Sequence, residues 1–363
     1  METRRYCAVP HVTPKVLSPG MNPKRAELIH TLSKKWVNGT TLTYYFFDRE
    51  EDGGYLEDSR EWKPWKGTLG QQNKVREGFE HWKNIGIGLN FKEVFAREEA
   101  DIRIGFMEDD GSWSYVGRDI KNQGVNERTM NFGWNVDTDD QYNGMDTVIH
   151  EIGHTIGFEH EHQNYNAGIV WDEEAVYRYF EGYPNYWKRE KTFENVIKKL
   201  SPIASKGTNW DPDSIMEYAF ESHLIRKPQE YYEKGLTPAG GLSDIDISYA
   251  RTLYPLQQGA RIKLVPLNSF TLEIQNSEQQ DFEFEPIEDG YYTIQTFGNI
   301  DSVLVLFSED KHGELKYLSA NDNGGVDSAA KVKWKMFKGR KYVVKLRLYY
   351  KNPGEKAAIM IWK

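Results

Sequence analysis

The chain has 363 residues, of which 39% are hydrophobic and 28% are charged, and its formal net charge is −9 at pH 7. A chain of this length exceeds what one hydrophobic core usually serves, so we expect two domains. The acidic balance argues against nucleic-acid binding, and the lack of an apolar run of about 20 residues argues against a membrane span.

The N-terminal stretch METRRYCAVPHV carries the single cysteine, Cys7, so an intrachain disulfide is excluded. It has no apolar segment of the kind that marks a secretion signal. Export by another route, a leader already removed and a protein that stays inside the cell are all compatible with this sequence.

The next part of the chain mixes strand and helix patterns. Thr40–Asp48 is rich in β-branched and aromatic residues and is predicted to be a strand. Apolar residues recur at helical spacing from about Leu69 to Ile85, which predicts an amphipathic helix. The stretches ADIRIGF (100–106) and TMNFGW (129–134) alternate apolar and polar residues and are predicted to be half-buried strands.

Two further helices are predicted from their capping residues. Asp172 precedes EEAVYRYF as a helix N-cap. Ser243 and Asp246 have the spacing of a capping box, in a helix that ends at Tyr254 before Pro255. The first part of the chain is therefore predicted to be an α+β domain.

After this point the pattern changes to short β-rich runs separated by turn residues. The runs are FTLEI, FEFEPI, YYTIQTF, SVLVLF, KVKWKMF, KYVVKLRLYY and AAIMIW. They predict an all-β sandwich of about a hundred residues. We therefore divide the chain into an N-terminal segment (1–33), an α+β domain (34–256) and a β-sandwich domain (262–363).

The string HEIGHTIGFEHEH, which begins at His150, is the strongest chemical signal in the chain. His150 and His154 are four residues apart, so on a helix both imidazoles reach one cation. Glu151 points about 100° away around that helix, where it suits a base acting on metal-bound water. Gly157 permits a left-handed turn that ends the helix and returns His160 as a third ligand.

Three histidines with one open position are typical of a catalytic zinc site, because structural zinc sites have four protein ligands. The alternative is a solvated polar helix that happens to be rich in histidine, and the full spacing through His160 disfavours it. His162 lies off this register, and we predict that it sits at the rim of the site or behind a ligand.

The string from His150 to His160 resembles the zinc signature of the metzincin metallopeptidases, whose catalytic domain has a twisted mixed sheet, helices and a zinc-binding helix. Members of this group place a methionine-containing turn beneath the metal, and DPDSIMEYAF supplies Met216 here. The Ser-Ile-Met-x-Tyr form resembles the astacin branch. The resemblance implies that Tyr218 approaches the zinc in the resting enzyme and helps to stabilise the oxyanion.

The resemblance to astacin-like domains extends over about residues 33 to 255. KKWVNGTTLTYYFFD resembles their first strand, and LSDIDISYARTLYP is similar to their closing helix. SWSYVGRD and TMNFGWN look like the segment above the cleft, whose edge strand pairs with an extended substrate. Astacins proper carry disulfides and an acidic residue that engages the mature N-terminus; here Glu161 lies in that neighbourhood. The chain therefore resembles bacterial or fungal relatives more than animal astacins.

The stretch RRYCAVPHV resembles the cysteine switch of matrix metalloproteinase propeptides, Arg-Cys-x-Val-Pro. A thiolate from Cys7 on the open zinc position would silence Glu151. Tyr6 separates the arginines from the cysteine, so the match is partial. An inert thiol in an N-terminal tail is the alternative. If the switch operates, the chain is a zymogen that is activated by removal of about its first thirty residues.

The C-terminal domain resembles the pre-peptidase C-terminal domain of secreted bacterial peptidases, a resemblance carried by DSVL and NDNG. Some relatives bind calcium in this region, which would make Asp322 a Ca²⁺ ligand. A simple strand-connecting turn is the alternative. Such domains are usually interaction or anchoring modules, so the resemblance implies a binding role.

We predict a monomeric, secreted or extracellular zinc endopeptidase that binds a peptide or protein as an extended strand; a cytoplasmic location is not excluded. Its predicted site residues are the zinc ligands His150, His154 and His160, the general base Glu151, the oxyanion stabiliser Tyr218 and the packing residue Met216. The alternative is a catalytically silent, metal-containing binding protein whose sandwich performs recognition. The intact base and ligands weigh against it.

Overall fold

The structure is a computed structural model that describes residues 4–13, 33–57, 59–137, 144–201, 209–256, 260–276, 278–322, 329–351 and 354–363. These residues form two compact units. The first unit contains residues 4–13, 34–36 and 40–256, and the second contains residues 33, 37–39 and those described from 260 onward. Each unit has its own hydrophobic core.

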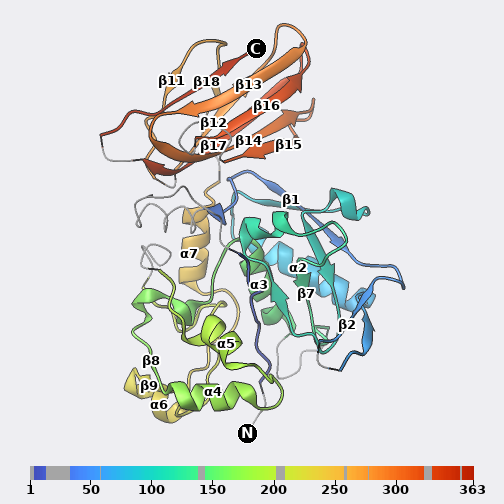
Figure 1. Cartoon of the computed structure of the whole chain (residues 1–363), viewed down its shortest axis with the longest axis vertical. Helices are drawn as coiled ribbons and strands as arrows, with labels where there is room; N and C mark the ends of the chain where they lie inside the picture. Colours follow the sequence, from blue (N-terminus) through green and yellow to red (C-terminus); the bar gives the residue numbers. More distant parts are fainter. Residues whose placement is uncertain are drawn as a thin grey trace. The chain divides into compact units, whose positions relative to one another are not determined.

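The first unit is built on a five-stranded mixed sheet (Figure 1). In spatial order its strands are β4 (Asn90–Glu93), β1 (Thr41–Phe46), β5 (Ile102–Gly105), β7 (Met130–Asn131) and β6 (Trp113–Ser114). The first four strands run parallel, and β6 pairs antiparallel with β7. Since β6 is the end strand, its outer edge can accept a further extended chain. A separate hairpin consists of β2 (Gly53–Tyr55) and β3 (Trp62–Pro64).

Two helices, α2 (Leu69–Asn84) and α3 (Gly144–Thr155), pack against this sheet. They approach so closely that a Cβ atom on Gly78 would lie 2.3 Å from a side-chain atom of α3. The indole of Trp82 in α2 donates a hydrogen bond of 2.9 Å to the carbonyl of Ile149 in α3. The position of α3 relative to the sheet is therefore set by tight packing and by a directed bond.

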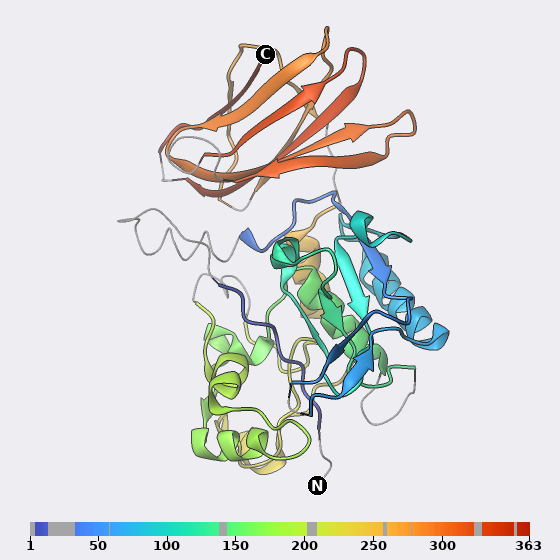
Figure 2. The same cartoon turned by 45° about the vertical axis from the view of Figure 1, so that its right-hand side comes forward.

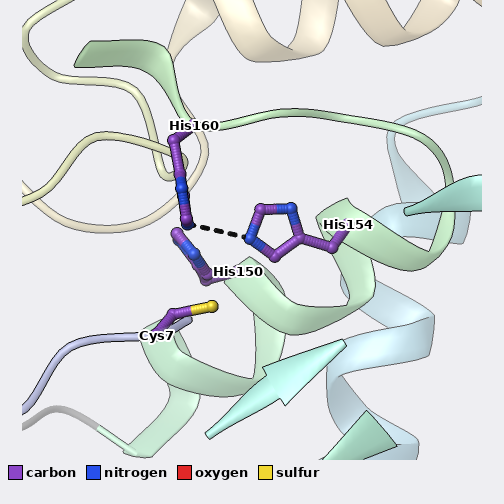
Figure 3. A group of neighbouring side chains, drawn as sticks. All are labelled: Cys7, His150, His154 and His160. Carbon is purple, nitrogen blue, oxygen red and sulfur yellow. Dashed lines mark hydrogen bonds between the residues drawn. The ribbon is translucent and has the colours of Figure 1, made fainter. Parts of the chain in front are cut away.

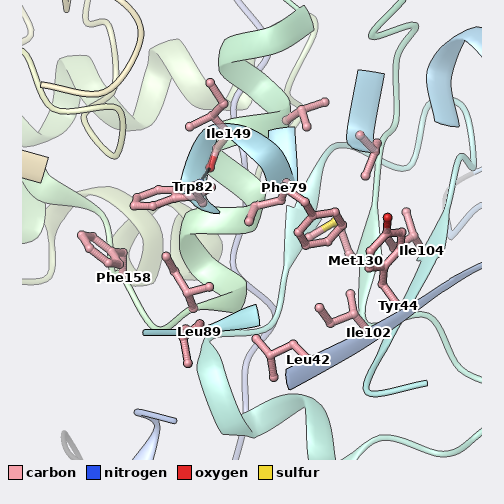
Figure 4. Close-up of a cluster of buried hydrophobic side chains, with 14 of the residues drawn as sticks. Leu42, Tyr44, Phe79, Trp82, Leu89, Ile102, Ile104, Met130, Ile149 and Phe158 are labelled. Atoms are coloured by element: carbon pink, nitrogen blue, oxygen red, sulfur yellow. Dashed lines mark hydrogen bonds between the residues drawn. The ribbon is translucent and has the colours of Figure 1, made fainter. Parts of the chain in front are cut away.

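Apolar side chains from the strands and from both helices form one continuous core (Figure 4). Its members include Leu42, Tyr44, Phe79, Trp82, Leu89, Ile102, Ile104, Met130, Ile149 and Phe158. Most of these residues are almost fully buried. Burial of apolar surface is the main stabilising contribution in such a core, so α3 is anchored along most of its length.

The rest of the first unit consists of short elements. They are β8 (Val170–Trp171), α4 (Glu173–Glu181), α5 (Arg189–Thr192), a π-helical turn (Phe193–Ile197), β9 (Ile225–Lys227), α6 (Gln229–Lys234), α7 (Asp244–Leu253) and the 3-10 turns Arg97–Glu99, Gly117–Asn122, Glu161–Gln163 and Tyr165–Ala167. The predicted caps are confirmed: Asp172 accepts from the amide of Ala175, and Ser243 with Asp246 forms a capping box. Local capping chemistry thus defines where α4 and α7 begin.

The second unit is a sandwich of two sheets. One contains β10 (Ile262–Lys263), β12 (Gln279–Phe284), β17 (Lys341–Lys351), β14 (Ile300–Glu309) and β15 (Leu315–Asn321). The other contains β11 (Phe270–Thr271), β18 (Ala358–Trp362), β13 (Gly290–Phe297) and β16 (Lys331–Met336). Alternate residues of both sheets enter one core, as expected for an all-β sandwich.

Some predicted elements differ from the structure. The strand predicted in 100–106 is buried on both faces, because all four residues of β5 are buried. Arg103 is tolerated there because its Nε donates to the carbonyl of Glu127 at 2.8 Å. The strand predicted in 129–134 shortens to the two residues of β7. Strands β10 and β15 were not predicted from the sequence.

Candidate metal centre

The central element of the site is α3, which carries His150, Glu151 and His154, all buried. The Nδ1 atom of each histidine faces a backbone carbonyl: Ile215 for His150 and Phe158 for His154, both at 2.8 Å. A carbonyl accepts from Nδ1–H, which leaves Nε2 as a lone-pair donor. Both imidazoles are thus held in the tautomer that binds a cation through Nε2.

The chain turns sharply after α3 and returns to the site with His160. Gly157 has φ of +99°, a conformation that favours glycine. The amide of Phe158 donates back to the carbonyl of Gly153 at 2.9 Å, which closes the end of the helix. His160 is 1% exposed, and its Nε2 lies 3.1 Å from Nε2 of His154 (Figure 3).

Four side chains form a group that could hold a metal ion, which we call the metal-binding group: Cys7, His150, His154 and His160. Their potential ligand atoms all lie within 4.8 Å of one another (Figure 3). Burial is the main cause that lowers the pKa of His150 to about 3 and that of His154 to about 4, so the imidazoles are neutral. Nε2 of His150 is buried without a hydrogen-bond partner. Neutral nitrogens converging beside one sulfur are the donor set that zinc prefers, so these residues fit a zinc ion.

Glu151 lies beside this group and is completely buried. Its Oε2 accepts a hydrogen bond from the Cys7 thiol at 3.5 Å, and its Oε1 is buried without a partner. Burial raises the pKa of Glu151 to about 8. A carboxyl group with a raised pKa next to a metal-binding group has the properties of a proton-transferring group.

Met216 lies beneath α3, where a Cβ atom on Gly153 would be 2.5 Å from its sulfur. The turn that carries Met216 is held by Asp246, whose carboxylate accepts from the hydroxyl of Ser214 at 2.7 Å and from the amide of Ile215 at 2.8 Å. The sequence indicated Asp246 only as a capping residue of α7. Its second role required the tertiary structure, because the two segments lie about thirty residues apart in the chain.

Tyr218 also reaches the site. Its hydroxyl lies 3.0 Å from Nε2 of His160 and donates a hydrogen bond to the carbonyl of Cys7. Burial raises the pKa of Tyr218 well above its usual value, so the phenol keeps its proton. A neutral phenol at this position is a hydrogen-bond donor directed into the site.

The described N-terminal residues pass through the first unit between the sheet and the α4–α5 region (Figure 2). The amide of Ala8 approaches the carbonyl of Ser112, next to β6, at 3.4 Å. Arg4 pairs with Glu221 at 3.4 Å, and the Cys7 side chain is buried. The resemblance of RRYCAVPHV to a cysteine switch was the only signal in the sequence that placed this segment at the site.

Two neighbouring residues complete the surroundings of the site. His162 is not in the metal-binding group; it stacks behind His160 with ring centroids 5.3 Å apart and is 1% exposed, so it does not lie at a rim. Its Nε2 faces the carbonyl of Asn195 at 2.9 Å. Glu161 accepts from the side-chain amide of Asn164 at 2.9 Å, and burial raises the pKa of Glu161 to about 8.

Asp322 lies in the second unit, directly after β15. Within the described part of the chain, the groups of three or more histidine, cysteine or carboxylate residues near enough to share a cation are limited to the metal-binding group. A calcium site at Asp322 therefore has no support in this structure and stays a prediction.

The structure combines a mixed sheet that has an antiparallel end strand with a helix beneath it. This helix presents two histidines and a glutamate to a third histidine, an arrangement that is typical of metal-dependent hydrolases. The sequence model of the astacin family of peptidases matches residues 66–255, and this chain belongs to that family. The membership confirms the predicted astacin-like resemblance and makes the matched region a zinc metallopeptidase domain.

Individual relatives agree with this membership. Protein SpAN from Strongylocentrotus purpuratus is 27% identical over 52% of this chain and 29% of its own length. Bone morphogenetic protein 1 from Xenopus laevis is 30% identical over 51% of this chain and 24% of its own length. The chain thus spans less than a third of these two curated relatives. The solved structure of myroilysin is 31% identical with a TM-score of 0.53, covering 63% of this chain and 98% of that one.

None of the helices in the described part of the chain is both long and apolar enough to cross a membrane.

Proposed function

We propose that this chain is a zinc-dependent endopeptidase that cleaves peptide bonds in proteins. The observation that carries the proposal is the convergence of the Nε2 atoms of His150, His154 and His160 beside the buried carboxyl group of Glu151. Membership of the astacin peptidase family supports the same chemistry.

In this proposal the three histidines hold the zinc ion. A zinc ion bound there would supply Lewis acidity, which polarises the scissile carbonyl and acidifies water. Glu151 accepts a proton from the attacking water and passes it to the leaving amine, since its carboxyl group lies beside the histidines and within hydrogen-bond reach of the thiol that occupies the fourth position. Tyr218 donates a hydrogen bond to the developing oxyanion. Met216 supports α3 and takes no part in the chemistry.

The chain as given is a latent form in this proposal, with the thiol of Cys7 occupying the position that water needs. Support comes from the burial of the Cys7 side chain and from its place within the metal-binding group. The hydrogen bond from Tyr218 to the Cys7 carbonyl is further support for a latent form, because it occupies the hydroxyl that would otherwise donate to the oxyanion. Removal of the N-terminal segment, residues 1–33, would expose both groups.

Substrates bind as an extended strand along the outer edge of β6. The approach of the Ala8 amide to the Ser112 carbonyl supports this, because the N-terminal segment already uses that edge. The sandwich domain acts as an interaction module, and the enzyme works as a secreted monomer. The interaction module and secretion rest on the resemblance of the sequence to secreted bacterial peptidases, and the monomer rests on the sequence demanding no higher oligomeric state.

The test pairs zinc content with activity on a quenched peptide library, for the full chain, a Glu151→Gln variant and a form lacking residues 1–33. We expect one zinc per chain in all three. Activity should rise on truncation, and Glu151→Gln in the truncated form should lower it by about 10²–10⁴-fold. An exposed carboxylate, Glu174→Gln, is the matched control. Zinc binding without cleavage by any form would overturn the peptidase and favour the silent binding protein.

A further inference from the structure

The residue before Cys7 fills a pocket at the site. Tyr6 is 7% exposed, and five aromatic rings surround it with centroids 4.7 to 6.4 Å away. We call these five residues the aromatic pocket: Tyr179, Phe180, Trp187, Tyr218 and Phe220. They come from α4, from the segment that follows it and from the segment after Met216. A flat aromatic ring is the side chain that such walls accommodate best.

The far end of the pocket is polar. The hydroxyl of Tyr6 donates a hydrogen bond of 2.8 Å to the carbonyl of Ala219, and it lies 3.2 Å from the hydroxyl of Tyr179. A carbonyl acceptor in an apolar enclosure costs free energy when the side chain beside it offers no donor. The pocket is therefore complementary to a phenol, with apolar walls for the ring and an acceptor for the hydroxyl.

The backbone around Tyr6 is held as a bound peptide would be. Its amide donates to the side-chain oxygen of Asn185 at 3.3 Å, and the side-chain amide of Asn185 donates to the carbonyl of Arg4 at 2.9 Å. One residue further on, Cys7 reaches the metal-binding group. The side chain in the aromatic pocket thus belongs to the residue adjacent to the one at the metal, which is where a residue flanking a scissile bond would lie.

We propose that the aromatic pocket is the specificity pocket of this peptidase, and that it selects tyrosine at one of the two positions flanking the cleaved bond. The proposal rests on the proposed peptidase function. In the full chain Tyr6 occupies the pocket as a substrate residue would, so the N-terminal segment blocks recognition as well as chemistry. Because the walls are apolar, an acidic side chain would lose its hydration on entry, and the pocket therefore disfavours it.

The experiment uses the whole chain, with the recognition sequence of a site-specific protease inserted within residues 14–32. The protein folds intact, is loaded with zinc and is then cut, and the N-terminal fragment is removed. Four otherwise identical peptides carry Tyr, Phe, Leu or Asp beside the bond to be cleaved, and kcat/KM is measured for each. Cleavage sites in a denatured protein, mapped by mass spectrometry, give an independent measure of the preference.

We expect kcat/KM for the tyrosine peptide to exceed that for phenylalanine by about tenfold, which corresponds to one net hydrogen bond of about 1.4 kcal/mol. It should exceed that for aspartate by at least about a hundredfold. In the denatured protein, tyrosine should be the residue most enriched beside the cleaved bonds. A preference for aspartate or leucine, or rates within about threefold for all four peptides, would overturn the proposed tyrosine specificity and leave the proposed peptidase function standing. No cleavage of any peptide would overturn both.

A pair of variants on α4 separates recognition from folding. Tyr179→Phe removes the hydroxyl that faces the substrate phenol, so it should lower the tyrosine-to-phenylalanine ratio by about twofold to fivefold. Tyr177→Phe is the matched control, because it makes the same change on the same helix outside the pocket, and it should leave the ratio unchanged. If the tyrosine-to-phenylalanine ratio is the same for the two variants and thermal unfolding is unaltered, the Tyr179 hydroxyl does not contact the substrate phenol.

Discussion

Two segments meet at the metal-binding group, and they are held there in different ways. Helix α3 is buried along its ligand-bearing length, and its histidines are oriented by backbone carbonyls. The N-terminal residues are held by separate side-chain contacts, among them an ion pair between Arg4 and Glu221 whose side chains are each 31% exposed. In the proposed function, the helix supplies permanent ligands, whereas the N-terminal segment supplies a ligand that can leave.

The difference shows which part of the site can be removed without loss of the core. Removal of α3 would destroy the core of the first unit, because its apolar face is part of that core. Removal of the N-terminal segment breaks a limited set of hydrogen bonds and ring contacts around Tyr6 and Cys7.

Substitution of a helix ligand should abolish metal binding. We expect His154→Ala to lose most of its zinc and to lower the activity of the truncated enzyme by at least about a thousandfold, since two histidines cannot hold a catalytic zinc. Zinc content by atomic absorption and kcat/KM on a quenched peptide check this. His162→Gln is the control, because that ring lies behind His160 and should leave one zinc per chain. Retention of zinc by His154→Ala would contradict the assigned ligand set.

Substitution of Cys7 should raise activity, whereas substitution of a helix histidine should lower it. We expect Cys7→Ser in the full chain to raise activity about tenfold or more, because a serine hydroxyl is a far weaker zinc ligand than a thiolate. The measurement compares the initial rate of peptide cleavage by the full chain with and without the substitution. Ala8→Ser is the neighbouring control. A Cys7→Ser chain that is as silent as its parent would show that the other contacts of the N-terminal segment, and not the thiol, maintain latency.

The close packing of α3 predicts a large stability effect for a small change. Gly153→Ala places a methyl group 2.5 Å from the Met216 sulfur and 3.3 Å from the ring of Trp82. We expect it to lower the free energy of unfolding by about 1–3 kcal/mol, despite the better helix propensity of alanine. Urea unfolding of the full chain measures the change. Gly124→Ala, where the added methyl group meets only Glu127 at 3.4 Å, should stay within about 0.5 kcal/mol. Equal stability of the two variants would mean that the Met216 side chain moves aside at little cost in free energy.

The partly exposed ion pair of the N-terminal segment should contribute little. Arg4→Ala removes an ion pair with partly exposed partners, worth about 0.2–1 kcal/mol. We therefore expect the activity of the full chain to rise by only about twofold to fivefold, and less at high salt. A double-mutant cycle with Glu221→Ala isolates the pair. An effect as large as that of Cys7→Ser would show that the ion pair, and not the thiol, maintains latency.

Local patterns in the sequence determined much of this protein. The caps of α4 and α7, the helical period of α2 and the spacing from His150 to His160 are all encoded within a few turns of chain, where neighbouring residues alone decide the geometry. The same holds for the strand-rich composition of the second unit. The three histidines that converge in the structure could therefore be predicted as one group from the sequence.

Only the tertiary structure decided what else reaches those histidines. Cys7 lies 143 residues before His150, and Tyr218 lies 58 residues after His160, so no local rule brings either of them to the site. The same is true of three other features: the burial of both faces of β5, the hydrogen bonds from the methionine turn to Asp246, and the aromatic pocket around Tyr6. Each depends on the packing of distant segments, which is a property of the whole core and not of any short stretch of sequence.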